Sequence, residues 1–205
     1  PPLVPEELGQ REGADALLIG GGASVHTHGD ALARLARREG MVVVHANVRN
    51  LGEVQRFGPG QVVCLAGEAA LRLPPSEQLQ RVGALAVPSA PRLAGAVPAG
   101  LAHLTRQVTP FLGAARPDQL GPVSDIGPLA LALGAALALG ARRVWLAGFD
   151  GYPNASVAQQ GLAQEIHTLL ERFAATHPDV GLRSLTPSLY PVPVESVYAR
   201  LAAHR

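Results

Sequence analysis

A glycine-rich turn is the segment of this chain best suited to binding an anion. The apolar run 14–19 is followed by GGGAS at residues 20–24 and then by an amphipathic stretch at residues 29–39. Glycines let the backbone turn sharply, and the free amides at a helix start favour phosphate. The turn lacks the full dinucleotide fingerprint, because Val25 stands at the third glycine position and no acidic residue ends the next strand. A purely structural turn therefore stays an alternative.

Polar residues follow two other predicted strands. Asn47 comes just after the run 41–45, and Asp150 and Tyr152 come just after the run 142–148. The carboxyl ends of parallel strands meet at one edge of a sheet, which is where ligands sit in open α/β folds. Asn47 and Asp150 could each bind a ligand, and each could equally close a turn.

Ser124 and Asp125 precede a long apolar helix predicted over residues 127–140. Ser124 is a good N-cap residue, and the same helix start could also bind phosphate.

These residues need a scaffold that alternates strands and helices. Continuous apolar runs typical of strands buried on both faces alternate with helical segments. The pattern predicts an α/β fold with a doubly wound, mostly parallel sheet and helices on both faces, a Rossmann-like architecture. Strands are predicted at 14–19, 41–45, 61–65, 83–87, 142–148 and 181–185, and helices at 29–39, 76–81, 127–140, 156–176 and 193–204.

The chain length predicts one domain over residues 14–205, preceded by a proline-rich linker or N-terminal extension over residues 1–13. The Pro- and Gly-rich segment 88–122 has little periodicity, and it is interpreted as a lid or an irregular subdomain. Cys64 lies in an apolar run and is predicted to be buried.

Composition excludes several classes of function. The chain has no lysine, so all 17 basic residues are arginines, which excludes a P-loop lysine and Schiff-base catalysis. With a net charge of +1 and no basic stripe, nucleic-acid binding is not expected. The longest apolar stretch, 129–141, is shorter than the roughly 20 residues that span a bilayer, and no signal peptide is visible. We therefore expect a cytoplasmic protein without a membrane span, and the spacing of its histidines predicts no metal site.

Two segments carry a resemblance to known proteins. LLIGGGASV at residues 17–25, with VVVHAN at residues 42–47, resembles the first half of the bacterial sialyltransferase-like fold. That group includes Campylobacter-type sialyltransferases, motility-associated glycosyltransferases and archaeal hydroxymethylpterin diphosphokinases. SDIGPLALALGAALALGARRVWLAGFDGY at residues 124–152 resembles the second motif of the group.

The tail SLTPSLYPVPVESVYA, residues 184–199, resembles a domain fused to aldolase-type TIM barrels of the HMG-CoA-lyase-like superfamily in surface-polysaccharide loci. The resemblance implies a fused or associated aldolase domain, with the proline-rich start as the linker.

The resemblance implies a nucleotide or nucleotide-sugar ligand and no other cofactor. The sialyltransferases carry Asn at the position of Gly21 and Pro at that of Ala23, so part of the family's nucleotide contact is missing here. The family's catalytic histidine follows the second motif, where His167 is the nearest candidate and His177 the next. We expect nucleotide binding by Gly20, Gly21, Gly22, Ser24, Asn47, Ser124, Asp125 and Tyr152, and catalysis by Asp150 and His167.

The leading hypothesis is a glycosyltransferase-like domain that uses a nucleotide sugar, such as a CMP-activated keto sugar acid, in surface-polysaccharide synthesis. One alternative is a non-catalytic ligand-binding or regulatory module of an aldolase, which the departures at Gly21 and Ala23 favour. A second alternative is a pterin diphosphokinase-like activity, which would require acidic metal ligands.

Overall fold

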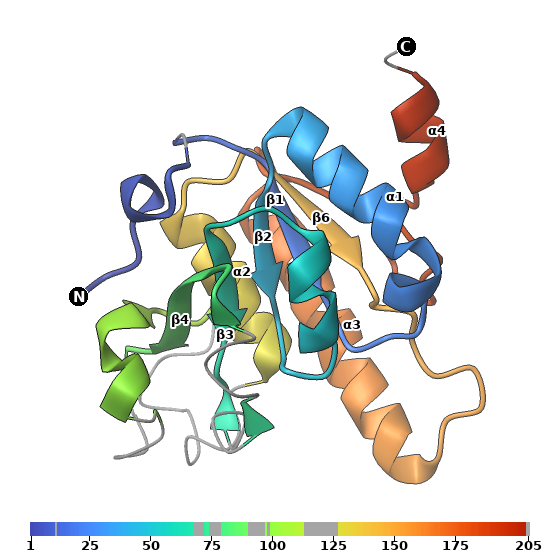
Figure 1. The fold of residues 1–205 in the computed structure, drawn as a ribbon. Helices are drawn as coiled ribbons and strands as arrows, with labels where there is room; N and C mark the ends of the chain where they lie inside the picture. Colours follow the sequence, from blue (N-terminus) through green and yellow to red (C-terminus); the bar gives the residue numbers. More distant parts are fainter. Residues whose placement is uncertain are drawn as a thin grey trace.

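The chain folds around a seven-stranded, all-parallel sheet in the order β5-β4-β3-β2-β1-β6-β7 (Figure 1). This computed structural model describes residues 1–10, 12–67, 72–73, 79–89, 97, 99–112 and 127–203. The strands are β1 (Ala16–Ile19), β2 (Val42–His45), β3 (Gln61–Cys64), β4 (Val82–Pro88), β5 (Thr105–Val108), β6 (Arg143–Ala147) and β7 (Gly181–Ser184). The α-helices are α1 (Ser24–Glu39), α2 (Pro128–Ala138), α3 (Val157–Thr176) and α4 (Val197–Ala202). The short 3-10 helices are η1 (Pro5–Leu8), η2 (Leu51–Arg56) and η5 (Ala99–Leu104).

Helices cover both faces of the sheet, which confirms the predicted doubly wound α/β fold. Alternate residues of each strand face opposite sides. Leu18 and Val44 pack into a core with α2 and α3, while Leu17 and Val43 pack into a second core with α1 and α4. Figure 1 shows these two helix pairs on opposite sides of the sheet. Both cores are needed because β1 and β2 are buried on both faces.

The order of the strands creates a topological switch point, which is where such folds bind ligands. β1 pairs with β2 on one side and with β6 on the other, with Ile19 opposite both His45 and Ala147. The connection from β1 runs through α1, and the connection from β6 runs through α3 on the other face. The chain therefore leaves β1 and β6 toward opposite faces of the sheet, at the carboxyl edge where such folds bind ligands.

Some predicted boundaries differ from the structure. α1 begins at Ser24, directly after the glycines, because a carboxylate from another loop caps its amino end. The C-terminal helix forms only over Val197–Ala202, since residues 191–194 bring prolines and a β-bridge between Val194 and Ser184. Part of the segment 88–122 forms η5 and the edge strand β5. Residues 76–78 of the predicted helix 76–81 lie outside the described residues.

The N-terminal residues pack against the sheet rather than standing apart from it. Leu3 and Leu8 are buried, and the amide of Leu3 donates to the carbonyl of Gln107 in β5. Cys64 is fully buried on β3, as predicted. Within the described residues, no helix is both long and apolar enough to cross a bilayer.

Candidate functional site

The carboxyl edge of the sheet gathers three of the segments singled out in the sequence. Gly20 follows β1, Asn47 follows β2 and Asp150 follows β6, and these three strands are neighbours. The amides of Gly20 and Gly22 donate to the carbonyls of Ala147 and Gly148, each at 2.8 Å. The glycine turn and the loop after β6 are therefore bonded directly to each other.

Close approach to this second loop explains the glycines at positions 20 and 22. A methyl group on Gly20 would lie 2.5 Å from the carbonyl oxygen of Gly148. On Gly22 it would lie 2.5 Å from a carboxylate oxygen of Asp150. Both distances are shorter than any real carbon contact, so a side chain would push the two loops apart. The chain itself, and not only a ligand, requires glycine here.

The carboxylate of Asp150 caps the amino end of α1. One oxygen accepts from the amide of Ser24 at 3.0 Å, and the other accepts a short hydrogen bond from the Ser24 hydroxyl. A negative charge at this point is favourable because the helix dipole is positive there. The structure thus places an internal carboxylate next to the amides that were expected to hold a phosphate.

Two backbone donors remain free at the turn. The amides of Gly21 and Ala23 have no hydrogen-bond partner among the described residues. The side chain of Arg49 lies over the turn, with its Cδ 3.0 Å from the place of a Gly21 methyl group. Within the described part of the chain, the side chain of Arg49 forms no ion pair. Two amides and one cation are therefore available to an anion.

Asn50 shapes the turn, and sequence reasoning did not identify it. Its amide nitrogen donates to the carbonyl of Gly20 at 2.7 Å and to that of Gly22 at 3.3 Å. The residue is 3% exposed, so these bonds are sheltered from water. Its neighbour Asn47 instead accepts from the amide of Arg49 at 2.9 Å and closes a local turn. Asn50 stands at the N-cap position of η2 but makes no side-chain cap bond there, so no local capping signal identifies it.

A third loop, after β7, supports the loop after β6. The hydroxyl of Thr186 accepts from the amide of Gly148, and the hydroxyl of Ser188 donates to the carbonyl of Phe149. Tyr152 is half-buried in the same region. Burial, with the nearby Tyr152 phenol as a smaller cause, raises the pKa of Tyr190 to about 12. Tyr190 therefore stays a neutral phenol at physiological pH.

The two predicted candidate histidines lie on and at the end of α3. His167 lies in the middle of α3, where its Nε2 is 3.2 Å from a carboxylate oxygen of Glu171 on the same helix. His177 lies at the end of α3 and packs against Phe111 and Phe173. Ser124 and Asp125 lie outside the described residues.

The first turn of α1 carries a pair that the sequence did not reveal. Nδ1 of His26 is 2.9 Å from a carboxylate oxygen of Glu53, which comes from η2. The side chain of Glu53 is 9% exposed, whereas that of His26 is 60% exposed. No three His, Cys, Asp or Glu side chains of the described residues cluster in a way that would hold a metal ion.

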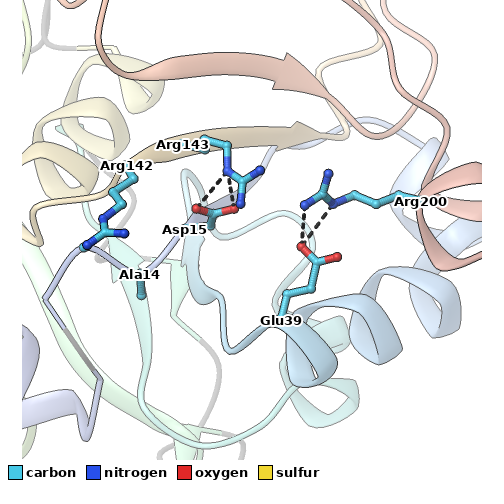
Figure 2. A pocket seen from close by; sticks show the side chains of 7 residues that line it. Ala14, Asp15, Glu39, Arg142, Arg143 and Arg200 are labelled. Atoms are coloured by element: carbon cyan, nitrogen blue, oxygen red, sulfur yellow. Dashed lines mark hydrogen bonds and ion pairs between the residues drawn. The ribbon is translucent and has the colours of Figure 1, made fainter. Parts of the chain in front are cut away.

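A second hollow lies at the opposite, amino edge of the sheet. Figure 2 shows this pocket of about 620 Å³, where Asp15 faces Arg143 and Glu39 faces Arg200. Trp145 donates its indole N–H to Asp15 at 2.9 Å, and the Arg200 guanidinium lies 4.3 Å from the Trp145 ring centre. These pairs join the residue before β1 to β6, and α1 to α4, so they hold the fold together. The pocket is lined by Gly13, Ala14, Asp15, Glu39, Arg142, Arg143 and Arg200.

Comparisons with known proteins extend this description of the fold. No protein-family model matches the chain, and no curated protein sequence matches it. The solved structure of a MAf glycosyltransferase from Magnetospirillum magneticum AMB-1 aligns with 93% of this chain, with a TM-score of 0.60 and 12% sequence identity. The alignment covers 34% of that protein, so this chain spans about a third of its length. The chain therefore has a glycosyltransferase-like α/β fold.

Proposed function

We propose that this domain binds a nucleotide sugar at the carboxyl edge of β1, β2 and β6 and acts in glycosyl transfer. One observation carries the proposal. The amides of Gly21 and Ala23, which have no hydrogen-bond partner among the described residues, lie at the amino end of α1, beside the side chain of Arg49, which forms no ion pair with those residues. These groups lie at the topological switch point of the sheet, where open α/β folds bind ligands. This combination suits a phosphate group.

Each residue of the site has a role in the proposal. The amides of Gly21 and Ala23 and the guanidinium of Arg49 bind the phosphate, while Gly20, Gly22 and Ser24 set the shape of the turn. Asn47 and Tyr152 contact the base or the ribose. Ser124 and Asp125, which lie outside the described residues, are proposed as further nucleotide contacts. Oriented donors of this kind also stabilise the charge that develops on a departing phosphate.

The likeness of the fold to a glycosyltransferase supports the reaction class. The donor class follows from the resemblance of residues 17–25 and 124–152 to sialyltransferase-like proteins, and we propose a CMP-activated keto sugar acid. The resemblance of residues 184–199 supports a further proposal, that the domain works with an aldolase-type TIM barrel in cytoplasmic steps of surface-polysaccharide synthesis.

A second candidate is a ligand-binding module without catalysis. The position of Asp150 favours it, because both carboxylate oxygens already accept hydrogen bonds from Ser24 at the start of α1. The catalytic roles of Asp150 and His167 remain predictions on either reading. The pterin diphosphokinase-like alternative differs from both in requiring ATP and a divalent cation.

A ligand screen separates these candidates. The thermal unfolding of the full chain is measured with CMP, CDP, UDP, GDP and ATP, each with and without Mg²⁺. We expect CMP to stabilise the protein without metal, by about 2.7 kcal/mol at 100 times its Kd. No stabilisation by any nucleotide would overturn the proposal in favour of the accessory module. Stabilisation by ATP alone, and only with Mg²⁺, would favour the kinase alternative.

Arg49 provides a sharper test of the same site. We expect Arg49→Gln to weaken CMP binding roughly 5- to 10-fold, because a charge-assisted hydrogen bond to phosphate is lost. Arg34→Gln is the matched control, since Arg34 is an exposed arginine further along α1. Titration calorimetry measures both variants. If the two variants bind CMP with equal affinity, Arg49 does not contact the nucleotide.

A further inference from the structure

We propose that His26, oriented by Glu53, is the general base that takes the proton from the acceptor hydroxyl during glycosyl transfer. This inference rests on the proposed function, since it names the base of the same site.

The geometry of the pair is that of an oriented histidine base. Nδ1 of His26 lies 2.9 Å from Oε1 of Glu53, a carboxylate that is almost fully buried. A carboxylate facing Nδ1 favours the tautomer with a proton on that nitrogen, which leaves Nε2 as a proton acceptor. The Nε2 atom has no partner in the described part of the chain, and the side chain is 60% exposed. The ring is thus fixed on one side and open to a substrate on the other.

The short helix η2 positions this pair together with the glycine turn. Residues three apart lie on the same face of a 3-10 helix, so Asn50, its N-cap, and Glu53 share a face. Asn50 donates to the carbonyls of Gly20 and Gly22, and Glu53 accepts from His26 one turn into α1. One rigid element therefore holds both the anion-binding turn and the proposed base.

A glycine inside α1 makes room for the carboxylate. A methyl group on Gly29 would lie 2.9 Å from Oε2 of Glu53 and 3.2 Å from Cδ of Arg56. Glycine in a helix interior costs about 0.5–1 kcal/mol relative to alanine, and here it admits the buried acid. Arg56 forms an ion pair with that same Oε2 and a second one with Asp30 of α1.

The other candidate bases fit this role less well. Asp150 is engaged by Ser24 through both oxygens, and His167 pairs with the exposed Glu171 on α3. His45 is fully buried, and this burial lowers its pKa to about 4. His26 is placed next to the glycine turn and is also held by a buried carboxylate.

In the proposed step, Nε2 of His26 accepts the proton of the acceptor hydroxyl while that oxygen bonds to the anomeric carbon of the donor. The bond between the anomeric carbon and the phosphate oxygen breaks, and its electron pair leaves with the nucleoside monophosphate. The imidazolium that forms is stabilised by the charge of Glu53. Water serves as the acceptor when the donor is hydrolysed.

The first experiment measures whether a nucleotide covers His26. Diethyl pyrocarbonate modifies accessible imidazole nitrogens, and mass spectrometry quantifies the modification of each histidine in the full chain with and without CMP. We expect CMP to reduce modification of His26 by more than fivefold. The matched control is His28, two residues along α1, whose partner is the hydroxyl of Tyr198 at 3.2 Å; its modification should change less than twofold. CMP that binds without protecting His26 overturns the proposal and leaves nucleotide binding intact.

The second experiment measures CMP release from CMP-N-acetylneuraminate. We expect His26→Gln to lower kcat by about 10²–10⁴-fold and leave KM within about threefold, because general base catalysis supplies that factor. His28→Gln should change kcat less than twofold. We also expect added imidazole to restore part of the activity of His26→Ala, which a structural loss would not allow. Circular dichroism checks that each variant is folded.

Three results would contradict these expectations in different ways. Unchanged turnover in His26→Gln would show that His26 is not the base, while the proposed glycosyl transfer would still stand. CMP binding without turnover in the unmodified protein overturns the base together with the catalytic part of the proposed function. No binding of CMP overturns both proposals.

Discussion

The two edges of the sheet use charge in opposite ways. At the amino edge, Asp15 and Glu39 each hold an arginine, and Arg200 also stacks on Trp145 (Figure 2). At the carboxyl edge, the amides of Gly21 and Ala23 and the guanidinium of Arg49 have no partner among the described residues. Removal of one partner from a sheltered ion pair destabilises a fold, whereas donors left open at a topological switch point suit a ligand. The pocket at the amino edge is therefore not the better candidate site.

Removal of Arg200 should have the largest effect on stability and none on the ligand site. Its side chain is 10% exposed and bonds to both Glu39 and Glu195. We expect Arg200→Ala to lower the free energy of unfolding by about 3 kcal/mol, since it leaves a sheltered carboxylate without its main partner. Chemical denaturation measures this change. Arg183→Ala is the control, because Arg183 is 52% exposed and should cost below about 1 kcal/mol. A CMP affinity altered by Arg200→Ala would contradict the separation of the two edges.

Acid should weaken the carboxyl edge through His45. Burial lowers the pKa of His45 to about 4 from the ordinary value of 6.5. The unfolded chain therefore binds a proton in this interval that the folded protein does not, and stability falls as the pH decreases from 6.5 to 4. The shift corresponds to about 3 kcal/mol over the whole interval. Urea unfolding at several pH values measures the slope, and NMR of the His45 ring should show a neutral imidazole at pH 5. A charged ring at pH 5 would contradict the prediction.

Substitutions of the adjacent residues Gly20 and Gly21 should affect stability and CMP binding differently. A methyl group on Gly20 meets the backbone oxygen of Gly148 at 2.5 Å, so Gly20→Ala should cost about 1–3 kcal/mol of stability. On Gly21 it meets the flexible side chain of Arg49 at 3.0 Å, so Gly21→Ala should cost below about 1 kcal/mol. Because Gly21→Ala displaces Arg49, it should also weaken CMP binding. Thermal unfolding and calorimetry measure the two effects. Equal destabilisation by both changes would show that the turn is not held as described.

Asp150→Asn should have a small effect on stability and distinguishes a cap from a base. The amide oxygen can still accept from Ser24, but the charge at the start of α1 is lost, which costs about 1 kcal/mol. We expect CMP to bind two- to fivefold more tightly, because a negative charge beside the phosphate is removed. Turnover should stay within about fivefold of the unmodified protein. A hundredfold loss of turnover would instead make Asp150 the base.

Local sequence was sufficient to predict the architecture and the place of the glycine turn. Apolar runs such as 142–148 and helical patterns such as 156–176 predicted strands and helices close to those observed. The edge strand β5 was missed because its residues, TRQV, are mostly half-buried and have no continuous apolar run. Proline and glycine around it hid the strand further.

The contacts at the site were beyond the reach of the sequence. Ser24 and Asp150 are 126 positions apart, and His26 and Glu53 are 27 apart. Glu53 lies on a 3-10 helix too short to produce a periodic pattern. His167 was chosen because it follows the second motif, but a position along the chain does not show which way a helical residue faces.

The sequence by itself determined the parallel sheet and the edge that bears the polar residues, because alternating apolar runs leave few ways to bury both faces of each strand. Only the tertiary structure decided what those residues do to one another. In the tertiary structure, Asp150 accepts a hydrogen bond from the start of α1, Asn50 donates to the glycine turn, and Glu53 contacts Nδ1 of His26. Such pairings depend on loops from separate strands meeting at one edge, which a linear pattern does not encode.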